Sequence, residues 1–180
     1  MRFTFFRCRI SNAAASRSSE LSQTTLYFFC GKMGAGKSTH ARRLAEAENA
    51  VLISEDEWLE MLYPEQIKTL DDYLHYSARL RPVVGRHVKN LLTTGTTVVL
   101  DFPANTIRQR AWFKCLYEDS GAEGKLLYLK VSDAICLERL RKRRAEQPDR
   151  QRFDNEQFFQ QVTQYFREPA PSEGFNIEMC

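Results

Sequence analysis

Short apolar runs alternate with amphipathic stretches along this chain, and the alternation predicts its elements. Five runs have the length and the apolar content of buried strands, namely residues 26–30, 51–53, 97–101, 126–131 and 175–179. Helices are predicted over residues 41–48, 57–63, 70–92, 107–117, 134–144 and 155–166. Strands that alternate with helices in this way predict an α/β fold with a parallel sheet covered on both faces.

Residues at the ends of these stretches indicate where several helices begin and end. Ser54 and Glu57 form the S-x-x-E pattern of a capping box, which would open the second helix. Gly95 follows the region 70–92 as a helix C-terminal glycine does. Pro82 is expected to kink this region or to split it into two helices, because proline lacks the backbone N–H that a helix interior uses.

Apolar side chains recur at helical spacing in two of the predicted helices. The buried face of the region 70–92 is expected to carry Leu74, Leu80, Val84, Val88 and Leu91. The inner face of the region 155–166 is expected to carry Phe158, Phe159, Val162, Tyr165 and Phe166. Cations of the first region are interpreted as a solvated face, with a substrate cleft as the alternative; they are Arg79, Arg81, Arg86, His87 and Lys89.

Composition narrows the class of protein. With 180 residues, 43% of them hydrophobic and 27% charged, the chain has the size and content of one soluble globular domain. A net charge of +3 is too small to indicate nucleic-acid binding by itself. The 5 cysteines include no C-x-x-C pair, which argues against a disulfide framework or a zinc site and indicates a reducing compartment. No apolar run reaches the ~18 residues that a membrane helix needs.

Residues 1–24 differ from the rest of the chain. They contain arginines and serines but no acidic residue before Glu20. This bias is typical of an organelle-targeting peptide. Residues 3–6 and the short length make a poor amphipathic helix, however, so a disordered leader is the preferred interpretation. We therefore predict one domain over residues 25–180 and a cytoplasmic protein, with organelle targeting as the alternative.

The first predicted strand runs into the sequence G-K-M-G-A-G-K-S-T. Gly31, Gly36, Lys37 and Ser38 match the Walker A pattern G-x-x-x-x-G-K-[ST], a loop that wraps nucleotide phosphates with inward N–H groups and a helix N-terminus. Lys37 is expected to reach the β- and γ-phosphates, and the hydroxyl of Ser38 to bind Mg²⁺. The predicted nucleotide-binding residues are Gly31, Gly34, Ala35, Gly36, Lys37, Ser38 and Thr39.

Two aspartates follow predicted strands at the edge where open α/β sheets bind ligands. Asp56 comes after the second strand, at a position where helix capping does not require an aspartate. Asp101 closes the third strand, where P-loop proteins carry an aspartate that holds or orients Mg²⁺. Because Phe102 and Pro103 follow at once, the strand is expected to end at Asp101. The plainer alternatives are an acidic first helical turn for Asp56 and a turn-forming residue before proline for Asp101.

Cations gather in the helix 134–144 and shortly after it, at Arg139, Arg141, Lys142, Arg143, Arg144, Arg150 and Arg152. Arg139 and Arg143 lie one turn apart and share a face. We interpret residues 139–153 as a lid that closes arginines over the transferred phosphoryl group, offsetting charge and excluding water. A solvated helix end is the plainer alternative. A nucleic-acid-binding patch is disfavoured, because no aromatic residues interleave these cations.

With these motifs the chain resembles the small P-loop kinases that include zeta toxin, chloramphenicol phosphotransferase and the polynucleotide kinase domain, a group often described as AAA-family ATP-binding proteins. The resemblance covers nearly the whole predicted domain and rests on G-K-M-G-A-G-K-S-T, I-S-E-D-E, V-V-L-D-F-P-A-N-T, E-R-L-R-K-R-R and P-A-P-S-E-G-F in this order. It implies a five-stranded parallel sheet of order 2-3-1-4-5 and transfer of the γ-phosphate of ATP to a hydroxyl group.

The resemblance also implies roles for single residues. Asp56 matches the aspartate that accepts the hydroxyl proton as general base, and Asp101 matches the one that helps to hold Mg²⁺ or substrate. Arg139 and Arg143 match lid arginines that contact the nucleotide and its phosphates, and residues 171–175 lie where such proteins pass the adenine. The predicted catalytic residues are Lys37, Asp56, Arg139 and Arg143, and the predicted metal ligands are Ser38 and Asp101.

We therefore predict a Mg²⁺-dependent kinase that acts on a small molecule or a nucleoside. One alternative is a slow ATPase or nucleotide switch that acts through a protein partner. Another is a polynucleotide 5′-hydroxyl kinase, which is weakened because D-F-P-A-N-T is less polar than the matching segment of polynucleotide kinases. The predicted partners are ATP and a hydroxyl substrate, without a membrane, and a monomer or small homo-oligomer is expected.

Overall fold

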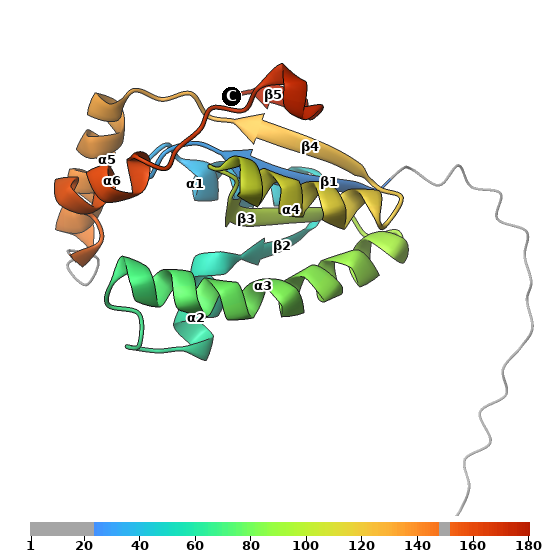
Figure 1. Cartoon of the computed structure of the whole chain (residues 1–180), viewed down its shortest axis with the longest axis horizontal. Helices are drawn as coiled ribbons and strands as arrows, with labels where there is room; N and C mark the ends of the chain where they lie inside the picture. Colours follow the sequence, from blue (N-terminus) through green and yellow to red (C-terminus); the bar gives the residue numbers. More distant parts are fainter. Residues whose placement is uncertain (1–23, 148–151) are drawn as a thin grey trace, which may run out of the picture.

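The computed structural model describes residues 24–147 and 152–180, so the predicted leader lies outside the described residues except for Thr24. The described chain forms a parallel sheet of order β2-β3-β1-β4-β5, which confirms the predicted topology (Figure 1). The strands are β1 (Thr25–Cys30), β2 (Val51–Ser54), β3 (Val98–Pro103), β4 (Glu123–Tyr128) and β5 (Asn176–Met179).

Helices cover both faces of the sheet, which gives the predicted three-layer sandwich. They are α1 (Lys37–Ala47), α2 (Glu55–Leu62), α3 (Leu70–Thr93), α4 (Ile107–Glu118), α5 (Asp133–Glu146) and α6 (Glu156–Thr163), followed by a 3₁₀ turn at Pro171–Glu173. Helices α2, α3 and α4 pack on one face, and α1, α5 and α6 pack on the other. None of the helices in the described ranges is long and apolar enough to cross a membrane.

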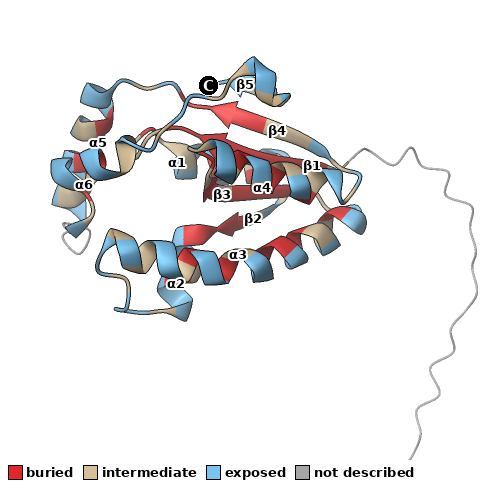
Figure 2. Ribbon diagram, viewed as in Figure 1, coloured by how far each residue is buried: buried red, intermediate tan, exposed pale blue. Residues whose placement is uncertain are grey.

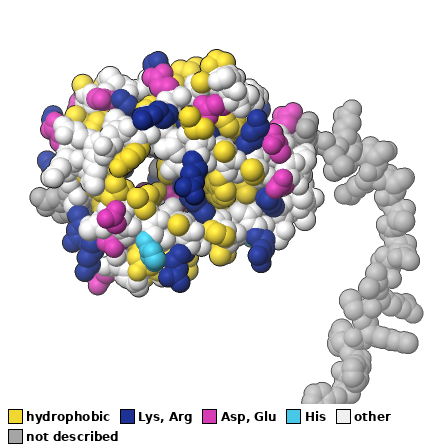
Figure 3. Space-filling model, viewed as in Figure 1, with side chains coloured by type: hydrophobic (Ala, Val, Ile, Leu, Met, Phe, Trp, Pro, Cys, Tyr) yellow, Lys and Arg dark blue, Asp and Glu magenta, His cyan; other side chains and the backbone are white. Residues whose placement is uncertain are grey.

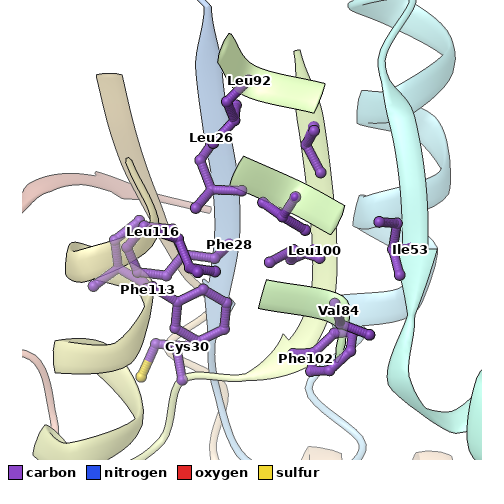
Figure 4. Packing of buried hydrophobic residues seen from close by; sticks show 14 of the residues in the cluster. Leu26, Phe28, Cys30, Ile53, Val84, Leu92, Leu100, Phe102, Phe113 and Leu116 are labelled. Carbon is purple, nitrogen blue, oxygen red and sulfur yellow. The ribbon is translucent and has the colours of Figure 1, made fainter. Parts of the chain in front are cut away.

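Strand β1 fills two separate cores, because successive residues of a strand point to opposite faces. Leu26 and Phe28 point toward α3 and α4, and Phe28 stacks on Phe113 with ring centroids 4.5 Å apart (Figure 4). Tyr27 and Phe29 point toward α1 and α5. Every residue of β1 is buried, as Figure 2 shows for the central strands. The loop that leaves β1 therefore starts from a fixed position.

Helix α1 begins at Lys37, four residues earlier than the sequence predicted. Gly36 precedes it with φ 104° and ψ 15°, a left-handed conformation that glycine adopts without strain. The buried residues of α1 are the small side chains of Ala41 and Ala45, which let the helix lie close to the sheet. The first N–H groups of α1 consequently lie directly after the loop.

Strand β3 corrects the prediction that Pro103 excludes a longer strand. It continues through Phe102 to Pro103, so Asp101 lies inside the strand and not at its end. The register against β1 jumps from Phe28 opposite Leu100 to Phe29 opposite Pro103. Proline is tolerated at such an irregularity, because the ladder there does not need its missing N–H.

Helix α3 is continuous, so the expectation that Pro82 splits the region is wrong. Pro82 and Ala78, whose carbonyl loses its helical donor, are both exposed, and water can satisfy that carbonyl. The predicted buried face holds for Leu80, Val84 and Val88. The prediction is wrong for Leu74, which is 53% exposed.

Three smaller predictions also need correction. The capping box is half formed, because Ser54 accepts from the N–H of Glu57 at 3.4 Å whereas the Glu57 carboxylate pairs with Arg42 at 3.0 Å. Strand β4 ends at Tyr128, not at residue 131, because its partner β1 ends there at Cys30. Tyr165 lies beyond the end of α6 and is 59% exposed, so it does not belong to the inner face.

Candidate functional site

The loop between β1 and α1 takes a shape that requires glycine. Gly34 and Gly36 have φ values of 80° and 104°, in the left-handed region. A side chain on Gly34 would place its Cβ 2.6 Å from the carbonyl oxygen of Cys136 in α5. Helix α5 therefore packs directly on the loop backbone, and Ala35 within the loop is buried. Ser38 and Thr39, by contrast, are exposed in the first turn of α1.

Lys37 lies across this loop. Its ammonium group donates to the carbonyl oxygens of Gly31 at 2.6 Å and Lys32 at 3.0 Å. Burial lowers the pKa of Lys37, whereas the nearby carboxylates of Asp101 and Asp56 favour its charged form. The Lys37 ammonium group is thus held at the loop, where it could bind a phosphate.

Asp101 lies beside Lys37 on β3. Its partner in the sheet register is Ser54, the last residue of β2. Burial raises the pKa of Asp101, and a hydrogen bond from Ser38 counteracts this. A serine hydroxyl and a carboxylate in contact form the donor set that P-loop proteins use for Mg²⁺.

Asp56 is the second residue of α2 and is exposed. Its negative charge acts on both Lys37 and Asp101 and alters the pKa of each. The structure therefore brings Lys37, Asp101 and Asp56 together, although they come from three different strand–helix connections. The described residues contain no cluster of three or more His, Cys, Asp or Glu side chains that could hold a metal by themselves. Mg²⁺ fits this donor set, since it commonly takes one or two protein oxygens together with phosphates and waters.

The two predicted lid arginines have different partners. Arg139 donates to the carbonyl oxygen of Ala35 at 2.8 Å, so it contacts the loop directly. Arg143 forms a two-pronged pair with Asp154, with both distances 2.5 Å, and the side chain of Asp154 is fully buried. Arg143 thus joins α5 to the segment before α6. The centre of the predicted lid, residues 148–151, lies outside the described residues.

A buried carboxylate next to Asp56 was not predicted from the sequence. Glu55 is 1% exposed and accepts hydrogen bonds from Tyr73 at 2.5 Å and Ser77 at 2.6 Å, while Arg81 lies at 3.4 Å. The sequence holds one signal for it, because Leu59 follows one helical turn later on the same buried face.

A buried arginine of α4 was also missed. The guanidinium of Arg110 is inaccessible to solvent and pairs with both carboxylate oxygens of Glu173, at 2.7 and 2.8 Å. It also donates to the carbonyl oxygens of Ala104 and Arg167 at 3.0 and 2.9 Å. Nearby, the side-chain oxygen of Asn105 accepts from the N–H of Gly31 at 3.0 Å. The segment 171–175 is thereby fixed to the start of α4.

These groups surround the carboxyl ends of the strands. Figure 3 shows a hollow there, between α6 and α3, with Lys and Arg side chains on its rim. A separate cavity of about 330 Å³ lies farther along α3 and α4, where Arg81 and Trp112 are among its lining residues. Residues 31–39, the two aspartates Asp56 and Asp101, and the buried side chains of Glu55 and Arg110 all lie at the edge of the sheet where the strands end.

Comparison with known proteins bears on the fold. A family model described as AAA domain matches residues 26–169. No curated protein matches the sequence. Among solved structures, Kti12 of Chaetomium thermophilum in complex with ADP-AlF3 has a TM-score of 0.61 and 19% identity, over 86% of this chain and 88% of that one.

Two further structures are kinases. A sugar kinase from Janibacter sp. HTCC2649 has a TM-score of 0.60 and 17% identity, over 87% of this chain and 84% of that one. The APS kinase CysC of Mycobacterium tuberculosis, in complex with AMPPNP and APS, has a TM-score of 0.54 and 16% identity, over 82% and 84%. At this identity the similarity shows the fold, which is that of P-loop kinases.

Proposed function

This chain belongs to the AAA domain family, whose model matches residues 26–169. Within this family, we propose that it is a kinase that transfers the γ-phosphate of ATP to a hydroxyl group of a small molecule or nucleoside. The observation that carries the proposal is that Lys37, the first residue after the loop, lies close enough to Asp101 and Asp56 for their charges to act on it, while Asp101 pairs in the sheet with Ser54, two residues before Asp56. Phosphoryl transfer demands mainly positioning and neutralisation of charge, and this group of side chains can provide both.

On the nucleotide side, residues 31–39 would bind the phosphates through backbone N–H groups and the N-terminus of α1. Lys37 would exchange its contacts with the loop carbonyls for the β- and γ-phosphates. Ser38 and Asp101 would hold Mg²⁺, which supplies positive charge to the phosphate oxygens when it is bound. Arg139, already in contact with Ala35, would approach the phosphates from α5. Residues 171–175, fixed by Arg110, would pass the adenine.

On the other side, Asp56 would orient the acceptor hydroxyl and accept its proton. Its exposure leaves the carboxylate accessible to a substrate. A general base must come within hydrogen-bond reach of the proton it takes, and Asp56 is the exposed carboxylate at the first turn of α2 that also acts on Lys37. Arg143 is proposed as a lid anchor, because its guanidinium is engaged by Asp154.

The proposal is tested with a screen of hydroxyl-bearing metabolites, in which ADP release is measured with Mg²⁺ and ATP. Lys37→Ala serves as the blank. With an acceptor in hand, Asp56→Asn is expected to lower kcat by at least about a hundredfold, within the range for a lost general base, while the Kd for ATP stays within about twofold of the unchanged protein.

Three outcomes would contradict the proposal or part of it. If Asp56→Asn abolishes ATP binding, Asp56 is not the acceptor-side base. If no hydroxyl compound raises ADP release above the water background, the slow ATPase or switch is the better account. If a 5′-hydroxyl oligonucleotide included in the screen is phosphorylated, and its binding falls steeply with salt, the polynucleotide alternative is the better account.

A further inference from the structure

The buried carboxylate of Glu55 is bound by three groups from one face of α3. Tyr73, Ser77 and Arg81 are spaced four residues apart, so their side chains follow one another along that face. The Tyr73 hydroxyl donates to one carboxylate oxygen at 2.5 Å, and the Ser77 hydroxyl donates to the other at 2.6 Å. Arg81 adds its Nε–H at 3.4 Å to the second oxygen. All three are donors, which is the set an ionised carboxylate requires.

Stability alone is a poor explanation for a charge in this place. Burial raises the pKa of Glu55, and the positive charge of Arg81 and the hydrogen bonds from Ser77 and Tyr73 oppose that change. An apolar side chain of similar volume usually stabilises a buried position at least as well as an ion pair does. A carboxylate does fix direction, since its hydrogen bonds are satisfied in one orientation only.

Direction matters here because Glu55 immediately precedes Asp56. Helix α2 has only 8 residues, too few to hold its own geometry without anchors. Its buried residues are Glu55 and Leu59, so Glu55 is the polar anchor of the first turn. Successive helical residues point about 100° apart. With Glu55 directed into α3, Asp56 lies on the exposed side of the same turn, close enough to Lys37 and Asp101 for its charge to act on both.

The contacts around Glu55 extend to Phe102, the residue that follows Asp101. The Arg81 guanidinium lies over the ring of Trp112, 5.2 Å from its centroid. Trp112 packs on Phe102 with centroids 5.9 Å apart, and Phe102 follows Asp101 in β3. A chain of contacts therefore runs from Glu55 through Arg81 and Trp112 to Phe102. It links the residue before Asp56 to the residue after Asp101.

We propose that Glu55 is a positioning residue, held by Tyr73, Ser77 and Arg81, which fixes the first turn of α2 so that the Asp56 carboxylate faces Lys37 and Asp101. The inference rests on the proposed kinase function for its catalytic consequence. In this proposal, residues of α3 determine the position of the Asp56 carboxylate without contacting the substrate.

The kinetic test uses Glu55→Gln, which keeps the shape but places an amide N–H₂ group among donors. It is expected to lower kcat by about tenfold to a hundredfold, as displacement of a reacting group by about 1 Å does, while the KM for ATP changes by less than twofold. Glu60→Gln, the same change at an exposed position of α2, is the charge control. Val88→Ala, a core substitution in the distal half of α3, is the stability control. Both controls are expected to retain kcat.

A second readout needs no acceptor. Hydrogen exchange of the amides of residues 55–59 is expected to quicken in Glu55→Gln and in Tyr73→Phe, while the amides of α4 around Phe113 keep their protection. If Glu55→Gln does not fold, Tyr73→Phe carries both measurements, since it removes one hydroxyl and keeps the ring.

The outcomes separate the two proposals. If the wild type phosphorylates no acceptor but exchange at residues 55–59 quickens in the variants, the kinase proposal fails and the positioning of the α2 turn stands. An unchanged kcat together with unchanged exchange would overturn the positioning role. A fall in kcat that Val88→Ala reproduces would also overturn it, because the effect would then follow from stability alone.

Discussion

The two sides of the candidate site are held together by different means. On the P-loop side, defined as residues 31–39, α5 and the pair of Arg110 with Glu173, backbone shape and close packing fix the loop itself, and one buried ion pair fixes the segment 171–175 beside it. On the α2 side, defined as α2 and the first half of α3, side-chain hydrogen bonds around Glu55 determine it. Triphosphates present the same shape to every nucleotide-binding protein, whereas acceptors differ. A loop that binds through its backbone suits the triphosphate, which is the same in every case. Side chains, which can be replaced during evolution, suit an acceptor that differs between proteins.

The largest effect should come from breaking the buried pair on the P-loop side. Arg110→Met removes the partner of Glu173 and the donors to two carbonyl oxygens. It is expected to lower the free energy of unfolding by about 3–5 kcal/mol, the usual result of leaving a buried charge without its partner. Urea denaturation measures the change. Arg108→Met, at an exposed position of the same helix, is the control, and a loss of less than about 1 kcal/mol, as at the surface, would show that Glu173 finds other partners.

A smaller effect is expected from the loop glycine, and it separates backbone strain from packing. Gly34→Ala combines a left-handed φ of 80° with a Cβ 2.6 Å from the Cys136 carbonyl oxygen. Gly95→Ala is the matched control, because Gly95 has φ 88° and nothing within 4 Å of its added Cβ. Both should lose about 1–3 kcal/mol of unfolding free energy from strain.

Only Gly34→Ala should lose more than this and also bind ATP less tightly. Thermal unfolding and ATP titration by calorimetry compare the two variants. Equal losses of stability with equal ATP affinity would mean that α5 moves away from the loop at little cost, which would weaken the contrast between the two sides.

The smallest effect concerns the start of α3, on the α2 side. Hydrogen bonds with Thr69 and from the N–H of Lys68 lower the pKa of Asp72. A carboxylate whose pKa is lowered by folding stabilises the fold above its ordinary pKa of 3.8 and ceases to do so as the pH falls through its lowered value. Asp72→Asn should therefore lower the Tm slightly at neutral pH, and the difference from the wild type should vanish in acid. Asp71→Asn, in the same turn, is the control; a Tm difference that persists in acid would contradict the assigned cause.

The order of strands and helices was predictable from the sequence because each strand is a compact apolar run. The glycine loop was predictable because the spacing of its glycines, lysine and serine is fixed by the phosphates it surrounds. The assignment of a role to Asp56 drew on resemblance as well, and it stays a prediction. The places where prediction was wrong are local, such as Pro103, which the irregular register with β1 accommodates.

The burial of Glu55 and of Arg110 was less predictable from the sequence than the strands and the glycine loop. Glu55 stands in the acidic run S-E-D-E, where composition alone does not say which carboxylate turns inward. Arg110 lies 63 residues from Glu173 in the chain, and no periodic pattern connects them. Leu74 has the spacing of a buried residue but is 53% exposed. Helical spacing shows which residues share a face, and only the tertiary arrangement shows which face has a partner.

The position of β1 in the sheet has a consequence for biosynthesis. Its two neighbours are β3 and β4, whose paired residues Val98 and Gly124 lie opposite Leu26. A ribosome therefore completes the strand and its glycine loop long before it makes either flanking strand, and the apolar side chains of Leu26 and Phe28 have no sheet partner in the meantime. Contacts so distant in sequence form late, and exposed apolar segments attract other chains while they wait. The segment that is translated first among these strands therefore gains its second sheet neighbour only after β4 has been made.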